Sequence, residues 1–227
     1  MFFVGNVYKQ FVNSLKLVGF RGTLSVIVSR LADFSFDNKY GTDTIAWIEL
    51  DDCDVNGELK NRGQRYQPSG TLSFRKLMRH LKLPPGEVLI DFGSGKGRVL
   101  LMAIEYGFSK AVGVEFSPEM CKVTRENVVK FTKKFGRAVD ITIAEGDAAE
   151  YHFKDEETVF YFYHPFDETI LKKVLDNISA SLKRKPRQAW LIYYYPIHRD
   201  LIEQPGSGFR KETELVLFGY KCVIYHT

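Results

Sequence analysis

The sequence predicts a three-layer α/β fold: a mostly parallel sheet of seven strands that ends in an antiparallel hairpin, preceded by a helical N-terminal extension. Three observations predict this fold. Short apolar runs alternate with helical stretches from residue 69 onward, a glycine-rich turn joins the first run to a helix, and no helix separates the last two runs. Such alternation is typical of a parallel sheet that helices cover on both faces.

The seven expected strands are short runs of aliphatic and aromatic residues: Val88–Phe92, Ala111–Glu115, Val139–Ala144, Thr158–Tyr163, Ala189–Tyr195, Glu214–Phe218 and Lys221–His226. A tight reversal at Gly219-Tyr220 is expected to join the last two. The expected helices are a stretch that begins after Ser69 and stops at Pro84-Pro85-Gly86, then Arg98–Tyr106, Pro118–Lys133 and Thr169–Leu182.

Composition places the chain among ordinary globular proteins. Its 227 residues are enough for one α/β domain with an attachment, which we divide into an extension, 1–65, and a main domain, 66–227. With 32 cationic against 28 anionic side chains, the surface is mixed, so it permits a nucleic-acid partner without demanding one. The three cysteines match neither a zinc site nor a disulfide framework, and the histidines share no ligand spacing. We therefore expect a cytoplasmic protein without a metal.

The first 20 residues are apolar enough to raise the question of a membrane. A spanning helix needs about 20 nearly charge-free residues, and here polar side chains interrupt the run at Lys9, Asn13, Lys16 and Arg21. We expect an amphipathic helix that packs on the core or on a partner, not a spanning segment, and peripheral membrane contact by residues 1–30 stays open. The following stretch, 36–70, is rich in Asp, Asn and Gly and is expected to be a covering loop or a linker.

The turn after the first strand carries the most specific signal. It places Gly93, Gly95 and Gly97 between a buried strand and a helix, with Asp91 near the end of the strand. Glycines permit positive φ angles and let a ligand approach the backbone, whose amides face it together with the helix N-terminus. A P-loop would need Ser or Thr after Lys96, where the chain has Gly97. A dinucleotide fingerprint would need a glycine in place of Arg98, and Asp91 would crowd a pyrophosphate.

The remaining pattern, (D/E)xGxGxG, fits every position. It resembles the first motif of class I S-adenosylmethionine-dependent methyltransferases, which have a Rossmann-like sheet. The resemblance implies that the turn, with Gly93, Ser94, Gly95 and Gly97, cradles the amino-acid end of S-adenosylmethionine. A nearby carboxylate at Asp91 suits this cofactor, because it carries an ammonium and a sulfonium but no phosphate.

Two further acidic positions support the same cofactor. Glu115 ends the second strand, 24 residues after Asp91, where a carboxylate can accept hydrogen bonds from both ribose hydroxyls. Phe116 follows it, and then Ser117 is expected to cap the next helix, with Pro118 in its first turn. By the resemblance, Asp147 would bond the adenine amino group, and Ala148 would contact the ring through its backbone.

The fourth strand ends in Tyr163-His164-Pro165-Phe166, where many class I enzymes that act on nitrogen carry Asn/Asp-Pro-Pro-Tyr/Phe. The match is partial, because Tyr163 and His164 replace the first half. We expect Tyr163 and Phe166 to form an aromatic wall for a cation, with Tyr163 also against the cofactor, and His164 to act as a base or orienting group. The alternative is ordinary packing in a covered sheet, which we expect for Tyr161.

Two other segments are expected to reach the site. Tyr195 and His198, after the fifth strand, can line an acceptor pocket. Upstream, Tyr66 and Ser69 resemble the covering loop of protein lysine methyltransferases of the non-SET type, which implies contact with the methionine end of the cofactor, whereas the plain interpretation makes Ser69 a helix cap. The wider stretch from Phe36 to Ala103 resembles a bacterial group of class I methyltransferases without an assigned substrate.

These observations predict a methyltransferase whose acceptor is a protein lysine or another nitrogen nucleophile. A small-molecule acceptor is the second hypothesis, and a cofactor-binding scaffold that recruits a partner is the third. A nucleic-acid acceptor is the least favoured, because the densest basic cluster, 183–187, lies at a helix end where cations already suit the dipole.

Overall fold

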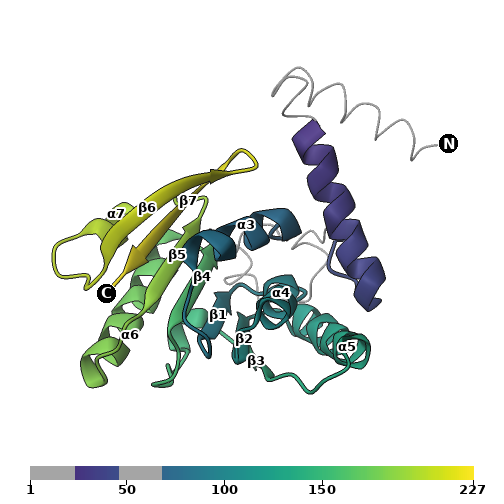
Figure 1. Cartoon of the computed structure of the whole chain (residues 1–227). Helices are drawn as coiled ribbons and strands as arrows, with labels where there is room; N and C mark the ends of the chain where they lie inside the picture. The colour runs from purple at the N-terminus through teal and green to yellow at the C-terminus, as the bar shows by residue number, and fades with distance from the viewer. Residues whose placement is uncertain (1–23, 46–67) are drawn as a thin grey trace.

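The structure, a computed structural model, describes residues 24–45 and 68–227 (Figure 1). Seven strands form one sheet in the order β3-β2-β1-β4-β5-β7-β6. The strands are β1 (Val88–Phe92), β2 (Lys110–Glu115), β3 (Ile141–Glu145), β4 (Val159–Tyr163), β5 (Trp190–Tyr194), β6 (Arg210–Leu217) and β7 (Tyr220–His226). The helices are α3 (Thr71–Leu81), α4 (Arg98–Tyr106), α5 (Pro118–Phe135), α6 (Glu168–Arg184), α7 (Asp200–Glu203) and the short 3₁₀ helix η2 (Ala148–Glu150).

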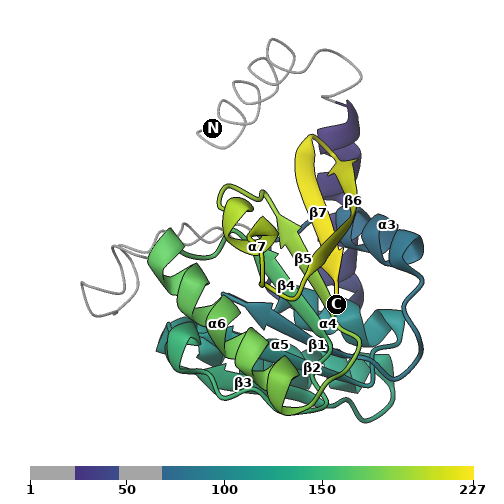
Figure 2. The same cartoon turned by 90° about the vertical axis from the view of Figure 1, so that its left-hand side faces the viewer.

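Strands β1 to β5 pair in parallel, and β7 inserts antiparallel between β5 and β6. Alternate residues of each central strand point to opposite faces and enter two separate cores. On β4, Tyr161 joins the core under α3 and α4, whereas Phe160 and Phe162 join the core under α6. Helices therefore cover both faces, as Figures 1 and 2 show, and the expected three-layer sheet is confirmed.

Most element bounds agree with the predictions, and the strand β1 and the helix α4 match them residue for residue. Helix α3 ends at Leu81, just before the predicted stop at Pro84-Pro85-Gly86, and Lys82 follows it in a left-handed conformation (φ 47°). The hairpin reversal predicted at Gly219-Tyr220 is wrong by one residue. The turn consists of Phe218 and Gly219, both with positive φ (51° and 90°), so Tyr220 belongs to β7.

Residues 24–40 are helical and pack on the α4 side of the sheet (Figure 1), so the loop or linker expected from residue 36 is wrong for residues 36–40. Phe36 and Tyr40 are buried there, and Asp33 accepts a hydrogen bond (2.7 Å) from the backbone N–H of Thr71 in the first turn of α3. The opposite stripe of this helical stretch is exposed and apolar: Leu24, Ile27, Val28, Leu31 and Phe34. Within the described ranges, no helix combines the length and apolar character needed to cross a bilayer.

Glu105 on α4 ties this helical stretch to the domain. Its carboxylate lies 2.9 Å from Lys39 Nζ and 2.8 Å from an Arg75 nitrogen, and it accepts a hydrogen bond (2.7 Å) from the Tyr40 hydroxyl. Burial alone would raise the pKa of Glu105, but the hydrogen bonds from Arg75, Lys39 and Tyr40 outweigh it and lower the pKa to about 2. The carboxylate is therefore charged at all physiological pH values.

Candidate functional site

The glycine turn lies between β1 and α4, and its geometry requires glycine. Gly93, Gly95 and Gly97 have φ angles of 72°, 52° and 81°. A Cβ atom at Gly93 would lie 2.7 Å from the Cβ of Pro165, and one at Gly97 would lie 2.5 Å from Cγ2 of Thr124. The turn is thus in close contact with the chain that follows β4 and with α5, so it is held from two sides.

Glu115 holds the turn from the next strand. Its two carboxylate oxygens accept hydrogen bonds from the backbone N–H groups of Gly95 (2.8 Å) and Ser117 (2.9 Å), and Thr124 Oγ1 donates to the carbonyl of Gly95 (2.7 Å). Burial raises the pKa of Glu115, and the backbone N–H groups of Ser117 and Gly95 oppose this rise. Each oxygen keeps a further lone pair, so the carboxylate can still accept hydroxyl hydrogens.

Asp91 is a second buried carboxylate at the same place, with 4% of its surface exposed. Burial, and then the charge of Glu115, raise its pKa well above the usual value. No hydrogen bond from a described residue is among the causes of this shift. A carboxylate buried in this way is costly unless a cation or a donor meets it, so the turn suits a ligand that brings one.

Ser94 and the ends of β2 and β3 extend the site along the sheet edge. The Ser94 hydroxyl is buried close to Gly113 of β2 and has no hydrogen-bond partner in the described part of the chain. Phe116 follows β2 and is half-buried. Asp147, which follows β3, accepts a hydrogen bond (2.8 Å) from the backbone N–H of Ala149 and caps η2, whose first residue, Ala148, is buried.

The residues after β4 and β5 share an unusual backbone. His164 (φ 39°) and Tyr195 (φ 54°) are non-glycine residues with positive φ, and each directly follows a strand; the preceding residues, Tyr163 and Tyr194, are paired in the sheet. Such conformations are strained and are concentrated at functional sites. They bring the rings of His164 and Tyr195 to 5.7 Å from each other.

His164 lies among aromatic and imidazole rings. Its Nδ1 is 3.3 Å from the Tyr193 hydroxyl, and its ring centre is 5.5 Å from that of His198. Burial, and then the charge of His198, lower the pKa of His164 below its usual value. The imidazole is therefore neutral at neutral pH and can accept a proton.

The three residues predicted as catalytic face different surroundings. Tyr163 is half-buried and contacts the rings of Tyr194 and Tyr220, whereas His164 turns toward Tyr193 and Tyr195. Phe166 packs edge-on against Phe92 and Phe162 in the core under α6. As expected, Tyr161 is buried in the core, at 1% exposed.

Ser69 does not cap helix α3, so that prediction is wrong. The cap residue is Gly70, which makes no side-chain cap bond, and the first-turn amide of Thr71 is satisfied by Asp33 instead. The Ser69 hydroxyl is buried and lies 2.9 Å from the hydroxyl of Tyr161 on β4. Tyr66, the other residue predicted from this segment, lies outside the described residues.

Sequence reasoning missed an ionic network beside the turn. Arg98, 1% exposed at the start of α4, lies 3.0 Å from Asp33 and 3.7 Å from Asp37, and its Nε donates to Thr44 Oγ1 (2.8 Å). Lys96 pairs with Asp43 in the same region (3.0 Å). The stretch Tyr40-Gly41-Thr42-Asp43-Thr44 was the sequence feature that could have indicated this network. Its partners, Lys96 and Arg98, are over 50 positions away in the chain, so local patterns do not pair them.

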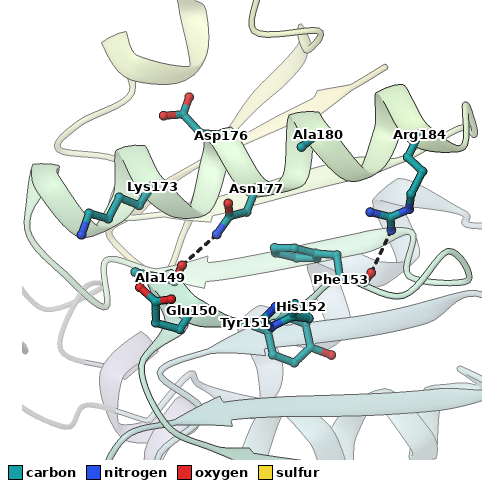
Figure 3. Close-up of a pocket in the computed structure, with 10 residues that line it drawn as sticks. All are labelled: Ala149, Glu150, Tyr151, His152, Phe153, Lys173, Asp176, Asn177, Ala180 and Arg184. Carbon is teal, nitrogen blue, oxygen red and sulfur yellow. Dashed lines mark hydrogen bonds between the residues drawn. The ribbon is translucent and has the colours of Figure 1, made fainter.

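One other part of the surface is separate from these residues. A cleft of about 480 Å³ lies between residues 149–153 and α6 (Figure 3), where Asn177 and Arg184 reach across to backbone carbonyls of Ala149 and Phe153. It contains none of the predicted site residues. Among the described residues, His, Cys, Asp and Glu side chains form no group of three that could hold a metal ion.

Comparison with known proteins identifies the class of domain that this chain resembles. Residues 89–185, which contain the glycine turn and both carboxylates, match a protein family described as a methyltransferase domain. No curated protein sequence matches the chain significantly.

Solved structures share the fold at low sequence identity. A putative methyltransferase from Escherichia coli is 14% identical with a TM-score of 0.55, covering 68% of this chain and 85% of its own. An RNA methyltransferase from Salinibacter ruber, solved with S-adenosyl-L-homocysteine, is 20% identical with a TM-score of 0.51, covering 70% and 93%. The pyocyanin biosynthetic protein PhzM is 14% identical with a TM-score of 0.54; 68% of this chain matches 54% of its length, so the chain spans about half of that protein.

Proposed function

Because this chain carries a class I S-adenosylmethionine-dependent methyltransferase domain, we propose that it methylates a nitrogen nucleophile on a protein, and most specifically the side-chain amine of lysine. S-adenosylmethionine is the cofactor of the domain. The domain is taken to span residues 66–227. Residues 1–65 then form an N-terminal extension whose described part, 24–45, is anchored on Arg98.

The glycine turn and its two carboxylates fit this cofactor. We assign the amino-acid end to the turn of Gly93, Ser94, Gly95 and Gly97, with Asp91 near the ammonium. This assignment supplies the buried carboxylate of Asp91 with a cation, whereas a phosphate would add a second anion there. The Ser94 hydroxyl lies close to β2, so its backbone is the part that we assign to the ligand.

The remaining cofactor contacts follow the order of the strands along the sheet edge. Glu115 is assigned to the ribose hydroxyls, and Phe116, Asp147 and Ala148 to the adenine ring. Ser69 is assigned, with Tyr66 and Tyr163, to the methionine end, and its bond to Tyr161 on β4 places it beside the same strand as Tyr163.

One observation carries the proposal of a nitrogen acceptor: a neutral, half-buried imidazole stands among aromatic rings where β4 ends. In the tautomer whose Nδ1–H donates to the Tyr193 oxygen, Nε2 of His164 is the free acceptor. An amine reaches the site as an ammonium at neutral pH and must lose a proton before it can react, so a base is needed.

When bound, S-adenosylmethionine supplies a methyl group activated by its sulfonium. The chain would hold the acceptor in line with that group and exclude water from it. Nε2 of His164 takes the proton of the ammonium. The freed lone pair of the amine would then be available to accept the methyl group that the cofactor supplies.

Transfer from methyl-labelled S-adenosylmethionine tests the proposal. The purified chain is incubated with a proteome extract and, separately, with a metabolite pool and with RNA. We expect labelled protein bands whose label is found on lysine, and transfer about 100-fold slower with His164→Asn. Label found only in small molecules would establish the second hypothesis. Cofactor binding without transfer to any acceptor would leave the scaffold hypothesis and refute ours.

A further inference from the structure

The corrected hairpin turn brings a third tyrosine to the acceptor side of the site. Because β7 begins at Tyr220 and runs antiparallel to β5, its first residue lies where β5 ends. The backbone N–H of Tyr195 donates to the carbonyl of Lys221 (2.9 Å), which fixes this register. Figure 2 shows the hairpin of β6 and β7 alongside β5.

The rings of Tyr163 and Tyr195 each contact the ring of Tyr220, and we call these three residues the tyrosine corner. The centroid of Tyr220 is 6.3 Å from that of Tyr163 and 6.2 Å from that of Tyr195, at interplanar angles of 71° and 82°. Both pairs are therefore edge-to-face contacts, which link the three rings through Tyr220. Tyr195 and Tyr220 are 47% and 41% exposed, so solvent reaches the corner.

Among the described residues, the groups around Tyr163 are aromatic. Burial raises the pKa of Tyr163, and the groups that raise it further are Tyr220, Tyr194 and Tyr195, so the nearest titratable neighbours are phenols. The ring of His164, whose lowered pKa keeps it neutral, contacts that of Tyr195. Aromatic ring faces of this kind attract a cation.

The strained backbone of Tyr195 is a second, independent indication. A residue with φ of 54° that buries its ring would be explained by packing, but Tyr195 leaves nearly half of its surface exposed. Strain that serves no core contact is typical of residues placed for a ligand.

We propose that the tyrosine corner is the subsite for an alkylammonium group, so that the acceptor is a flexible side-chain amine and its methylated forms are also bound. This inference rests on the proposed function and names the chemistry of its acceptor. Tyr195 and Tyr220 are then specificity residues. Their rings meet the cation, and a neutral acceptor of the same shape would gain only the apolar contact.

The test compares a cation with its neutral isostere. N-acetyl-trimethyllysine amide and the analogue with carbon in place of the quaternary nitrogen are titrated into the full chain, with and without saturating S-adenosylhomocysteine. We expect the cation to bind at least about fivefold more tightly than the neutral analogue, as cation–π attraction of about 1 kcal/mol implies. Equal affinity, or no binding of the cation, would overturn the proposal without any variant.

Variants locate the subsite. Tyr195→Ala and Tyr220→Ala should each lose about threefold to thirtyfold in affinity for the cation, whereas the phenylalanine substitutions should retain it within about twofold. Tyr106→Ala, at a tyrosine of similar exposure (42%) outside the site, is the matched control. Affinity for S-adenosylhomocysteine should be unchanged in all variants. If the wild-type protein does not bind S-adenosylhomocysteine, the proposed function is wrong. If the alanine variants bind the cation as tightly as wild type does, only the assignment of the subsite to the tyrosine corner is wrong.

Discussion

Replacing Asp91 by asparagine should change cofactor affinity and stability in opposite directions. The carboxylate is 4% exposed, and burial and the charge of Glu115 raise its pKa. Its charged form therefore destabilises the fold of the free protein. With the cofactor bound, we propose that it meets the ammonium. The amide has nearly the same shape but no charge, which separates the two effects.

The magnitudes follow from the chemistry of the site. A hydrogen bond to a charged group contributes about 1.5–3 kcal/mol, so the variant should bind S-adenosylhomocysteine about 10- to 150-fold more weakly. Without ligand, relief of the buried charge should stabilise the fold by about 1–2 kcal/mol, or about 2–8 °C in Tm for a chain of this size.

The stability gain should depend on pH. A carboxyl whose pKa is raised in the folded state stabilises the fold while it is protonated, and this contribution is lost as pH rises through the folded pKa. The difference between Asp91→Asn and wild type should therefore be small near the ordinary pKa of 3.8 and large at pH 8.

Calorimetry with S-adenosylhomocysteine and thermal unfolding from pH 4 to 8 make these measurements. Asp176→Asn, at a side chain 67% exposed on α6, is the matched control and should change neither quantity. An Asp91→Asn protein that is less stable than wild type at pH 8 and binds the cofactor equally well would refute both the destabilising buried charge and its partner.

Three further predictions test other parts of the site. Gly97→Ala should destabilise the fold by about 1–3 kcal/mol in chemical denaturation, because φ is 81° and the added carbon meets Thr124. Gly86 also has a positive φ (91°) but open space around it, so Gly86→Ala measures the conformational cost alone and should lower the free energy of unfolding by less. Glu105→Gln should cost about 1–3 kcal/mol at pH 7, after discounting for its exposed partners. Because the folded pKa of Glu105 is lowered from 4.5 to about 2, that deficit should disappear as pH falls through this range, and a deficit that persists at pH 2 would contradict the ion-pair account. His164→Asn should lower kcat about 100-fold while affinity for S-adenosylhomocysteine stays within about twofold, and the acid limb of the wild-type kcat profile should lie below pH 6.5; an acid limb above that value would exclude His164 as the base.

Local sequence patterns were enough for the framework of the protein. The strand β1, the glycine turn and the helix α4 were predicted to the residue. Hydrophobic periodicity, short apolar runs and glycines in turns all depend on a few neighbouring positions. The same holds for the cap of α5, where Ser117 accepts the hydrogen bond from Met120 that its residue type predicts. The order of the acids along the chain also followed, because each strand of a parallel sheet ends at the same edge.

Long-range contacts decided what local rules could not. Ser69 has the right residue type for a cap, yet its hydroxyl meets Tyr161, 92 positions away, and Asp33 takes over the bond to Thr71. The observed hairpin turn lies one residue before the predicted one. The pairing of β7 with β5 selects the register, whereas two aromatic residues flanking a glycine leave the local pattern ambiguous.

The sequence alone therefore predicted the fold, because its alternating runs depend on neighbouring residues, and the resemblance of the glycine turn implied the cofactor. Only the folded structure decided which side chains share a space: that Asp91 is buried near Glu115, that His164 faces Tyr193, and that Tyr220 joins Tyr163 and Tyr195. The physical reason is that burial and pKa depend on atoms that the sheet brings together from strands distant in the chain.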